Sequence, residues 1–160
     1  MDDPGAELRL AIQDVLPSLR RMTDGDASHK PSPEKWSPKE VIGHLIDSAS
    51  NNHGRFVRGM LQDDLVFPGY DQDAWVNAQQ YANHSWEDLL ALWAQFNLHI
   101  ARVMERVPEN VRKRSRSTHN LHEIGFRKID EGDAVTLHWL MEDYVEHLQH
   151  HLRQIHPSKS

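Results

Sequence analysis

Three histidines are concentrated near the C-terminal end of this 160-residue chain, at positions 147, 150 and 151. His147 and His151 are four residues apart in a segment with helical periodicity, so their imidazoles lie on one face, one turn apart. Two imidazoles in this arrangement can bind the same metal ion. His150 lies on an adjacent face, and we expect it to face solvent or to contact the ligands from outside. Because two histidines alone hold a metal ion weakly, the pattern predicts a further ligand elsewhere in the chain.

The third ligand should be a histidine or carboxylate on the apolar face of another helix, because metal sites in helical bundles are built from inward-pointing side chains. His44 fits this description best, since it lies between Val41 and Leu45. His53 and His99 lie farther from the centre of an apolar face. Alone, His44 would be interpreted as a core histidine with one hydrogen-bonded nitrogen. Unpaired polar groups are costly in a small core, so the three histidines together favour a shared site.

We therefore predict that His44, His147 and His151 hold one divalent ion, zinc or nickel. Structural zinc sites normally have four protein ligands, whereas a site with three leaves a position for water or substrate. The ion would lower the pKa of a bound water or thiol enough to make a nucleophile near neutral pH. Asp47, one turn after His44, is the candidate catalytic residue, which would orient the site or act as a base. The alternative for Asp47 is a surface carboxylate paired with a lysine or arginine.

The composition excludes several other kinds of site and partner. The chain has no cysteine, so any metal ligand must be a nitrogen or oxygen atom. The formal net charge of -6 argues against a nucleic-acid partner, because binding phosphates requires basic residues. No apolar run approaches the roughly 18 residues of a membrane span, and the acidic N-terminus lacks the apolar stretch of a secretory signal. We expect a cytoplasmic protein with a small-molecule substrate, no nucleic acid and no membrane.

Four segments must position these side chains, and each has the apolar spacing of an amphipathic helix. The expected helices cover residues 5–22, 37–60, 85–107 and 133–155. Pro17 should kink or split the first of them. Ser37 and Glu40 form a capping box around Pro38, which marks the start of the second helix. The last helix should end before Pro157.

The connections between these helices are long enough to cross the bundle. Residues 62–85 are rich in aromatic side chains and should pack on the body, with a short helical turn near 73–80. Residues 109–132 are polar and irregular, with a weakly strand-like stretch at 124–129. Their basic run, 112–116, should be a solvated loop, with contact to a phosphate or anionic substrate as the alternative. The sequence thus predicts one all-α domain over residues 1–160, a four-helix bundle with long crossover connections.

Three stretches of the chain, taken in order, resemble a known family. The first runs from Trp36 to Ser48 and continues with Asn51, Arg55 and Phe56; the second is Gly69 to Trp75; the third is Tyr144 to Ile155. They resemble the second helix, the loop after it and the last helix of the DinB/YfiT-like superfamily. The similarity spans all four expected helices, and the ordered set is more specific than any single stretch.

The resemblance implies a divalent metal, often nickel or zinc, bound by one histidine of the second helix and a histidine pair of the last. His44, His147 and His151 match those positions. Members of the family include bacillithiol S-transferases and mycothiol-dependent maleylpyruvate isomerase, and others are called metal-dependent hydrolases. Homodimers are common in the family, so a homodimer is expected here.

The leading hypothesis is an enzyme whose metal activates a low-molecular-weight thiol cosubstrate, or water, for attack on a small electrophile. Asp47, Ser48 and Asn51 would line the pocket from the second helix, and Tyr70 and Trp75 would contact the substrate from the loop that covers part of its mouth. Thiol transfer and hydrolysis are both compatible with the sequence. The alternatives are a non-catalytic module that binds metal or a small ligand, and a plain bundle with incidental histidines.

Overall fold

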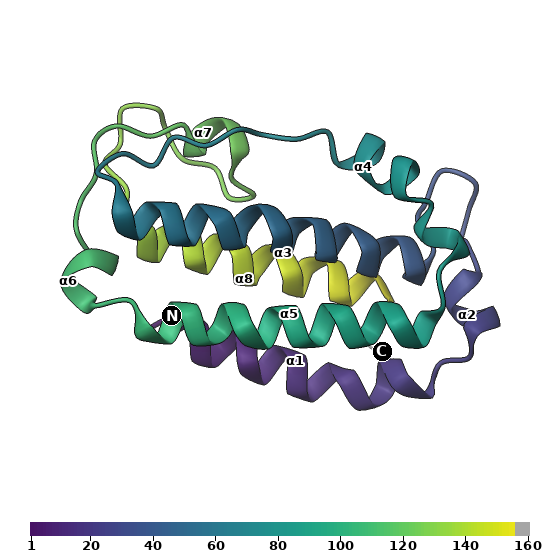
Figure 1. The fold of residues 1–160 in the computed structure, drawn as a ribbon. Helices are drawn as coiled ribbons and strands as arrows, with labels where there is room; N and C mark the ends of the chain where they lie inside the picture. The colour runs from purple at the N-terminus through teal and green to yellow at the C-terminus, as the bar shows by residue number, and fades with distance from the viewer. Residues whose placement is uncertain (156–160) are drawn as a thin grey trace.

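Four long amphipathic helices form the body of the protein in the computed structural model, which describes residues 1–155 (Figure 1). Their bounds are α1 (Pro4–Arg21), α3 (Pro38–Leu61), α5 (Trp86–Arg106) and α8 (Leu137–Ile155). Short helices occupy the connections: α2 (Asp24–Ser28), α4 (Gln72–Gln79), η1 (Tyr81–Asn83), α6 (Glu109–Arg112) and α7 (Leu121–Ile124). The predicted all-α four-helix bundle is confirmed. So is the short helix expected near residues 73–80, which is α4.

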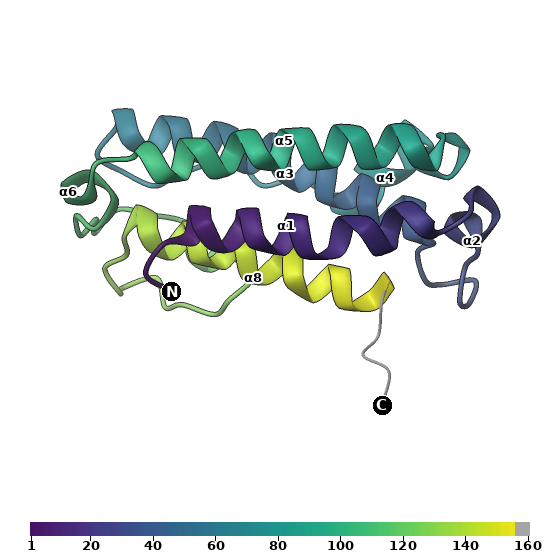
Figure 2. The same cartoon turned by 90° about the horizontal axis from the view of Figure 1, so that it is seen from below.

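The order of the long helices around the bundle differs from their order along the chain. The packed pairs are α1 with α5, α5 with α3, α3 with α8, and α8 with α1, which leaves α1 opposite α3 and α5 opposite α8. Figures 1 and 2 show that α3 and α5 run in one direction, opposite to α1 and α8. Residues 62–85 must therefore carry the chain back along the bundle. The long crossover connections follow from this topology.

Apolar side chains from the long helices fill the centre of the bundle. Trp93, Phe56, Leu8 and Ile100 have essentially no exposed surface. The ring of Phe56 in α3 packs edge-on against the ring of Tyr144 in α8, with centroids 5.6 Å apart. Because these buried side chains fix which faces of α3 and α8 are turned toward each other, they also orient the histidines on those helices.

The start of α3 is set by the capping box that the sequence predicts. Ser37 Oγ accepts the backbone N–H of Glu40 at 3.3 Å, and Glu40 Oε1 accepts the backbone N–H of Ser37 at 3.1 Å. Pro38 occupies the first turn, where a missing N–H costs nothing. The cap therefore fixes the register of a 24-residue helix that carries His44 in its second turn.

Pro17 does not split α1, although a split was one of the two outcomes expected from sequence. The helix continues without interruption to Arg21. Ile12 and Leu19 are buried on either side of the proline, and the indole N–H of Trp86 donates to the carbonyl of Leu19 at 2.9 Å. Packing against α5 thus offsets the backbone hydrogen bond that proline cannot make.

The last long helix begins later than predicted, at Leu137 rather than at Asp133. The backbone of Val135 is held in extended conformation by reciprocal hydrogen bonds with Arg116. The side chain of Thr136 then accepts the backbone N–H of Trp139 at 2.9 Å, as a helix-capping residue does. Long-range pairing therefore takes up residues that local pattern assigned to the helix.

The connection before α8 is partly helical rather than strand-like. It contains α6 and α7. Residues 124–129, all of which the structure describes, form no strand. Arg116, in the basic run, is 3% exposed, so the expected solvated loop is wrong at this residue. Its guanidinium donates to the backbone carbonyls of Gln62, Asp63 and Val111, which ties this connection to the end of α3.

Two other expectations concern the chain as a whole. Within residues 1–155, no helix combines the length and the apolar character needed to cross a bilayer. The single domain over residues 1–160 stays a prediction, and its last five residues lie outside the described range.

Candidate metal site

Three histidines from α3 and α8 meet at one point, and we call His44, His147 and His151 the histidine triad. One ring nitrogen of each can be chosen so that all three lie within 4.8 Å of one another. The Nε2 atoms of His44 and His147 are 3.2 Å apart. The ring centroid of His151 lies 4.6 Å from that of His44 and 4.5 Å from that of His147. The structure thus brings together the three residues that the sequence nominated as ligands.

The geometry of the triad fits a shared divalent ion. Two neutral imidazole nitrogens that face each other can share only one proton, so the pair is poorly satisfied by hydrogen bonding alone. Two nitrogen ligands of one tetrahedral zinc ion lie about 3.3 Å apart, given Zn–N bonds of about 2.0–2.1 Å. The observed separation of 3.2 Å between the Nε2 atoms of His44 and His147 is close to this value.

The remaining nitrogen of His151 has a partner of the kind that metal-binding histidines use. Its Nδ1 lies 2.9 Å from Oε1 of Gln154, one turn further along α8. An amide oxygen can only accept, so Nδ1 carries the proton and Nε2 keeps its lone pair. A hydrogen bond of this type fixes both the tautomer and the orientation of a ligand ring.

The electrostatic environment keeps the triad uncharged. Burial lowers the pKa of His44 to about 3, with a further contribution from the charge of His151. Burial likewise lowers the pKa of His147 to about 3, assisted by His151, His44 and His150. The pKa of His151 is also lowered, again mainly by burial. Neutral imidazole is the form that binds a metal ion, so the site is prepared for one at neutral pH.

A glycine next to the triad allows a neighbouring segment to pack closely. A Cβ at Gly43 would overlap the ring of Tyr81, which packs on α3 at this position. The Tyr81 hydroxyl donates to Oδ1 of Asp47 at 2.7 Å, and Gln79 Nε2 donates to the same oxygen at 2.8 Å. Burial raises the pKa of Asp47, although both hydrogen bonds oppose the rise. Asp47 therefore ties α4 and η1 to α3, one turn from His44.

Aromatic rings flank the triad on two sides. The ring centroid of Trp36 lies 4.9 Å from that of His44. The ring of Phe126, which is 46% exposed, lies 5.4 Å from His147 and 5.2 Å from His150. The triad is therefore in contact with aromatic rings from two segments outside α3 and α8, and Phe126 also lines the adjoining cavity.

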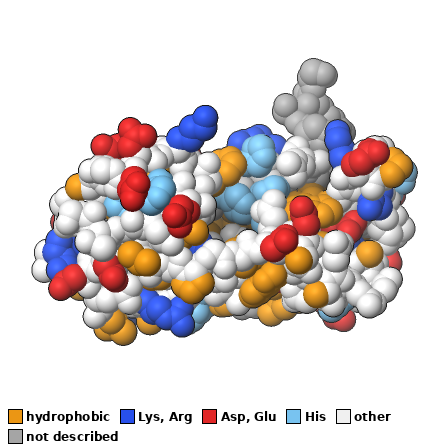
Figure 3. Space-filling view, turned by 90° about the horizontal axis from the view of Figure 1, so that it is seen from above, with side chains coloured by type: hydrophobic (Ala, Val, Ile, Leu, Met, Phe, Trp, Pro, Cys, Tyr) orange, Lys and Arg blue, Asp and Glu red, His pale blue; other side chains and the backbone are white. Residues whose placement is uncertain are grey.

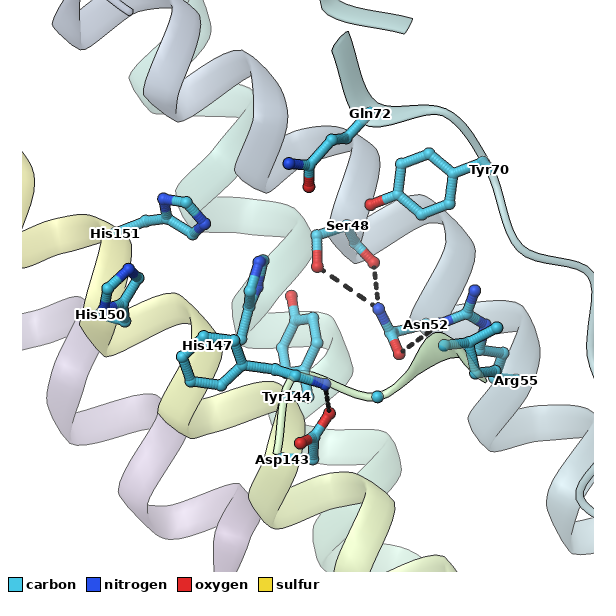
Figure 4. A pocket seen from close by; sticks show the side chains of 13 residues that line it. Ser48, Asn52, Arg55, Tyr70, Gln72, Asp143, Tyr144, His147, His150 and His151 are labelled. Carbon is cyan, nitrogen blue, oxygen red and sulfur yellow. Dashed lines mark hydrogen bonds between the residues drawn. The ribbon is translucent and has the colours of Figure 1, made fainter. Parts of the chain in front are cut away.

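A polar cavity of about 360 Å³ adjoins the triad between α3 and α8. Its lining consists of Ser48, Asn52, Arg55, Tyr70, Gln72, Ile124, Gly125, Phe126, Asp143, Tyr144, His147, His150 and His151. Figure 4 shows the α8 histidines on one side and the α3 side chains on the other. Histidine side chains gather near the middle of the face seen from above (Figure 3). The volume is that of a small-molecule site.

The structure places some of the predicted substrate-binding residues in this cavity and others outside it. Ser48 and Tyr70 line the cavity. Asp47, Asn51 and Trp75 are not among its described lining residues. The side-chain amide of Asn51 donates to the carbonyl of Asp47 at 2.9 Å, and the ring of Trp75 lies 5.0 Å from that of Tyr70. These three residues are placed to support the lining rather than to form it.

Sequence reasoning missed several lining residues, although some of them carry a signal. Ser48, Asn52 and Arg55 follow His44 at steps of four, four and three residues, which places them on the same face of α3. Following that face beyond Ser48 would have identified Asn52 and Arg55. Asp143 lies four residues before His147 on the same face of α8, and its carboxylate accepts the backbone N–H groups of residues 126 and 127.

Comparison with known proteins agrees with this description. A family model described as the DinB superfamily matches residues 7–155. The chain is 24% identical over 134 residues to "Putative metal-dependent hydrolase YfiT" of Bacillus subtilis (strain 168), covering 84% of this chain and 70% of that protein. A solved structure of YfiT from Bacillus subtilis, described as a "probable metal-dependent hydrolase with an unusual four-helix bundle topology", superposes with a TM-score of 0.76 at 21% identity. That match covers 96% of this chain and 82% of the other, and it shows the shared fold.

Proposed function

We propose, since this chain belongs to the DinB superfamily, that it is a divalent-metal-dependent enzyme acting on a small electrophilic substrate. The observation that carries the proposal is the histidine triad, with ring nitrogens from α3 and α8 within 4.8 Å of one another beside a cavity. A related protein from Bacillus subtilis bears the name of a metal-dependent hydrolase, which supports the same class of chemistry.

His44, His147 and His151 would hold the ion. Zinc and nickel both suit three imidazole ligands in a chain that offers no thiolate. A bound ion would supply Lewis-acid chemistry, lowering the pKa of the nucleophile at its open position and polarising the substrate.

The protein's own residues would orient the ligands and the substrate. Gln154 fixes the tautomer of His151, and Trp36 packs against His44. Ser48 and Tyr70 present hydroxyl groups to the cavity, and Asn52 adds a side-chain amide. These groups can hydrogen-bond a polar substrate without carrying charge. The hydrogen bonds of Asp47 to Tyr81 and Gln79 hold this carboxylate in place one turn from His44. Its roles in orienting the site and as a base stay predictions.

The proposal takes water as the nucleophile, in keeping with the name of the relative. A low-molecular-weight thiol is the other nucleophile that the family resemblance implies. Turnover of a panel of small esters, amides and epoxides by metal-loaded protein, with and without added thiols, decides between them. Turnover that requires a thiol would replace hydrolysis with thiol transfer, and binding of metal without turnover of any substrate would favour the non-catalytic module.

Metal retention is the first test of the site. Untagged protein loaded with zinc or nickel and desalted should contain about one ion per chain by elemental mass spectrometry. His44→Ala and His147→Ala should each reduce this content at least tenfold, because loss of one of three ligands leaves only two. His99→Ala, an exposed histidine on α5, is the matched control and should retain the ion. Equal retention by the triad variants and the control would refute the metal site.

A further inference from the structure

A buried arginine lies at the end of the cavity away from the histidine triad. Figure 4 shows Arg55 and His151 on opposite sides of the cavity. The side chain of Arg55 is only 5% exposed. Its Nη2 donates to the carbonyl of Pro68 at 3.1 Å, and its Nη1 makes a long hydrogen bond of 3.4 Å to Oδ1 of Asn52. Its Nε is buried and has no hydrogen-bond partner among residues 1–155.

The positive charge of Arg55 has no carboxylate partner within 4.0 Å in the described part of the chain. Burial lowers the pKa of Arg55, and the charge of Asp143, on the facing helix α8, partly opposes this change. Both oxygens of Asp143 are already engaged, because they accept the backbone N–H groups of Phe126 at 2.9 Å and Arg127 at 2.6 Å. The guanidinium of Arg127 also lies 3.6 Å from Asp143. Asp143 therefore anchors the turn at residues 126–127 rather than pairing with Arg55.

Other buried cations of the bundle are better satisfied than Arg55. Lys39, 4% exposed, pairs with Asp24 at 2.9 Å. The Nε of Arg116 also lacks a partner among residues 1–155, but its two Nη atoms donate to three backbone carbonyl groups and thereby hold two connections together. Arg55 has one good carbonyl acceptor and lines a cavity that reaches the triad. A buried charge without a counter-ion is strongly unfavourable, so an anion supplied by a ligand would complete this site.

We propose that Arg55 is a specificity-determining residue that binds a carboxylate group of the substrate. A guanidinium group matches a carboxylate in shape and can donate two parallel hydrogen bonds to it. Ser48, Asn52 and Tyr70 line the cavity beside Arg55 and can hydrogen-bond the same group or the chain attached to it. The substrate is then a small carboxylic acid whose acid group binds at Arg55 and whose electrophilic carbon lies at the histidine end. The placement of the electrophilic carbon at the histidine end rests on the proposed function, whereas the carboxylate site at Arg55 does not.

Carboxylate binding can be measured without metal, which removes any contribution from an ion at the triad. Butanoate and its neutral analogue butanamide are titrated into ¹⁵N-labelled protein in the presence of EDTA. We expect butanoate to bind roughly tenfold more tightly than butanamide, because a buried guanidinium discriminates charge. The Nε–H signal of Arg55 should shift with butanoate and stay in place with butanamide.

Variants of Arg55 locate the binding site. Arg55→Gln should abolish the preference for butanoate, and Arg55→Lys should retain only part of it. Arg58→Gln, which removes an exposed arginine one turn further along α3, should leave the preference unchanged. Equal affinity of unmodified protein for butanoate and butanamide would overturn the proposal even if Arg55→Gln failed to fold, and so would an unchanged preference in folded Arg55→Gln.

The result is separable from the test of the metal site. If the protein retains metal but shows no preference for butanoate, the carboxylate site is refuted and the proposed metal chemistry stands. If the protein prefers butanoate but fails to retain metal, the carboxylate site stands and the proposed metal chemistry is refuted.

Discussion

At the scale of single residues, the triad histidines make folding sensitive to acid when no metal is bound. His44, which is buried, and His147, which is half-buried, have pKa values near 3, whereas a histidine in an unfolded chain titrates near 6.5. Between pH 3 and 6.5, these histidines are mostly protonated in the unfolded chain and mostly neutral in the folded protein. The contribution of these two neutral rings to the free energy of unfolding is therefore fully present well above pH 6.5 and is lost progressively as the pH falls toward 3.

This linkage gives a pH prediction for the metal-free protein. Lowering the pH from 7 to 5 should reduce the free energy of unfolding by about 1 to 2 kcal/mol for each of His44 and His147. His147→Leu should show a smaller difference between the two pH values, measured by urea unfolding in EDTA. His29→Gln, at an exposed position, should show the same difference as unmodified protein. An unchanged pH difference in His147→Leu would contradict the assignment of a neutral imidazole to His147.

The residues of the site were predictable to the extent that helical spacing governs them. The four-residue step between His147 and His151 is sufficient to place both rings on one face, and the apolar neighbours of His44 indicate an inward position. Arg55 was not identified, because an arginine in a helix is normally exposed and its acceptor, the carbonyl of Pro68, lies in a connection. Asp47 was predicted close to the triad, but its bonds to a distant segment could not be derived from spacing.

At the scale of the elements, the close packing of η1 on α3 depends on the absence of a side chain at Gly43. A helical glycine replaced by alanine normally gains about 0.5–1 kcal/mol of stability. Here the added methyl group would overlap the ring of Tyr81, so Gly43→Ala should instead reduce the free energy of unfolding by about 1–3 kcal/mol. The displaced ring would also weaken the hydrogen bond from Tyr81 to Asp47.

The control for this change is Gly132→Ala, because among the described residues no atom beyond its own chain neighbours lies within 4 Å of a Cβ at that position. It should alter the free energy of unfolding by less than about 0.5 kcal/mol in chemical denaturation. A stabilised Gly43→Ala protein would show that Tyr81 does not pack as described.

Local signals predicted the elements well where the chain itself supplies them. The capping box of Ser37 and Glu40 fixes the start of α3 within the chain's own sequence. A split at Pro17 and the start of α8 were predicted wrongly, because packing on α5 and pairing with Arg116 decide them. Both contacts join residues that are far apart in sequence, and no local pattern reports such contacts.

At the scale of the whole molecule, ligands on two long helices make metal binding a contribution to global stability. An ion present at about 100 times its Kd stabilises the folded state by about 2.7 kcal/mol. For a chain of this size, that corresponds to a rise in Tm of about 5–10 °C. Calorimetry of protein in EDTA and in excess zinc should show this rise.

Two variants decide whether the rise in Tm comes from the triad. His147→Ala should show little or no increase with zinc, whereas His99→Ala should respond like unmodified protein. A full increase in His147→Ala would place the stabilising ion elsewhere. The homodimer expected from the family resemblance stays a prediction, and sedimentation of the same samples would test it.

The long separation between the two halves of the triad has a topological consequence. His44 and His147 are 103 residues apart, so an ion bound by both would close a loop spanning most of the chain. Closing a loop of that length restricts an unfolded polymer in the way a disulfide does. This chain contains no cysteine, and an exchangeable ion would act as a reversible cross-link in its place. Resistance of the whole bundle to proteases would then follow the supply of metal.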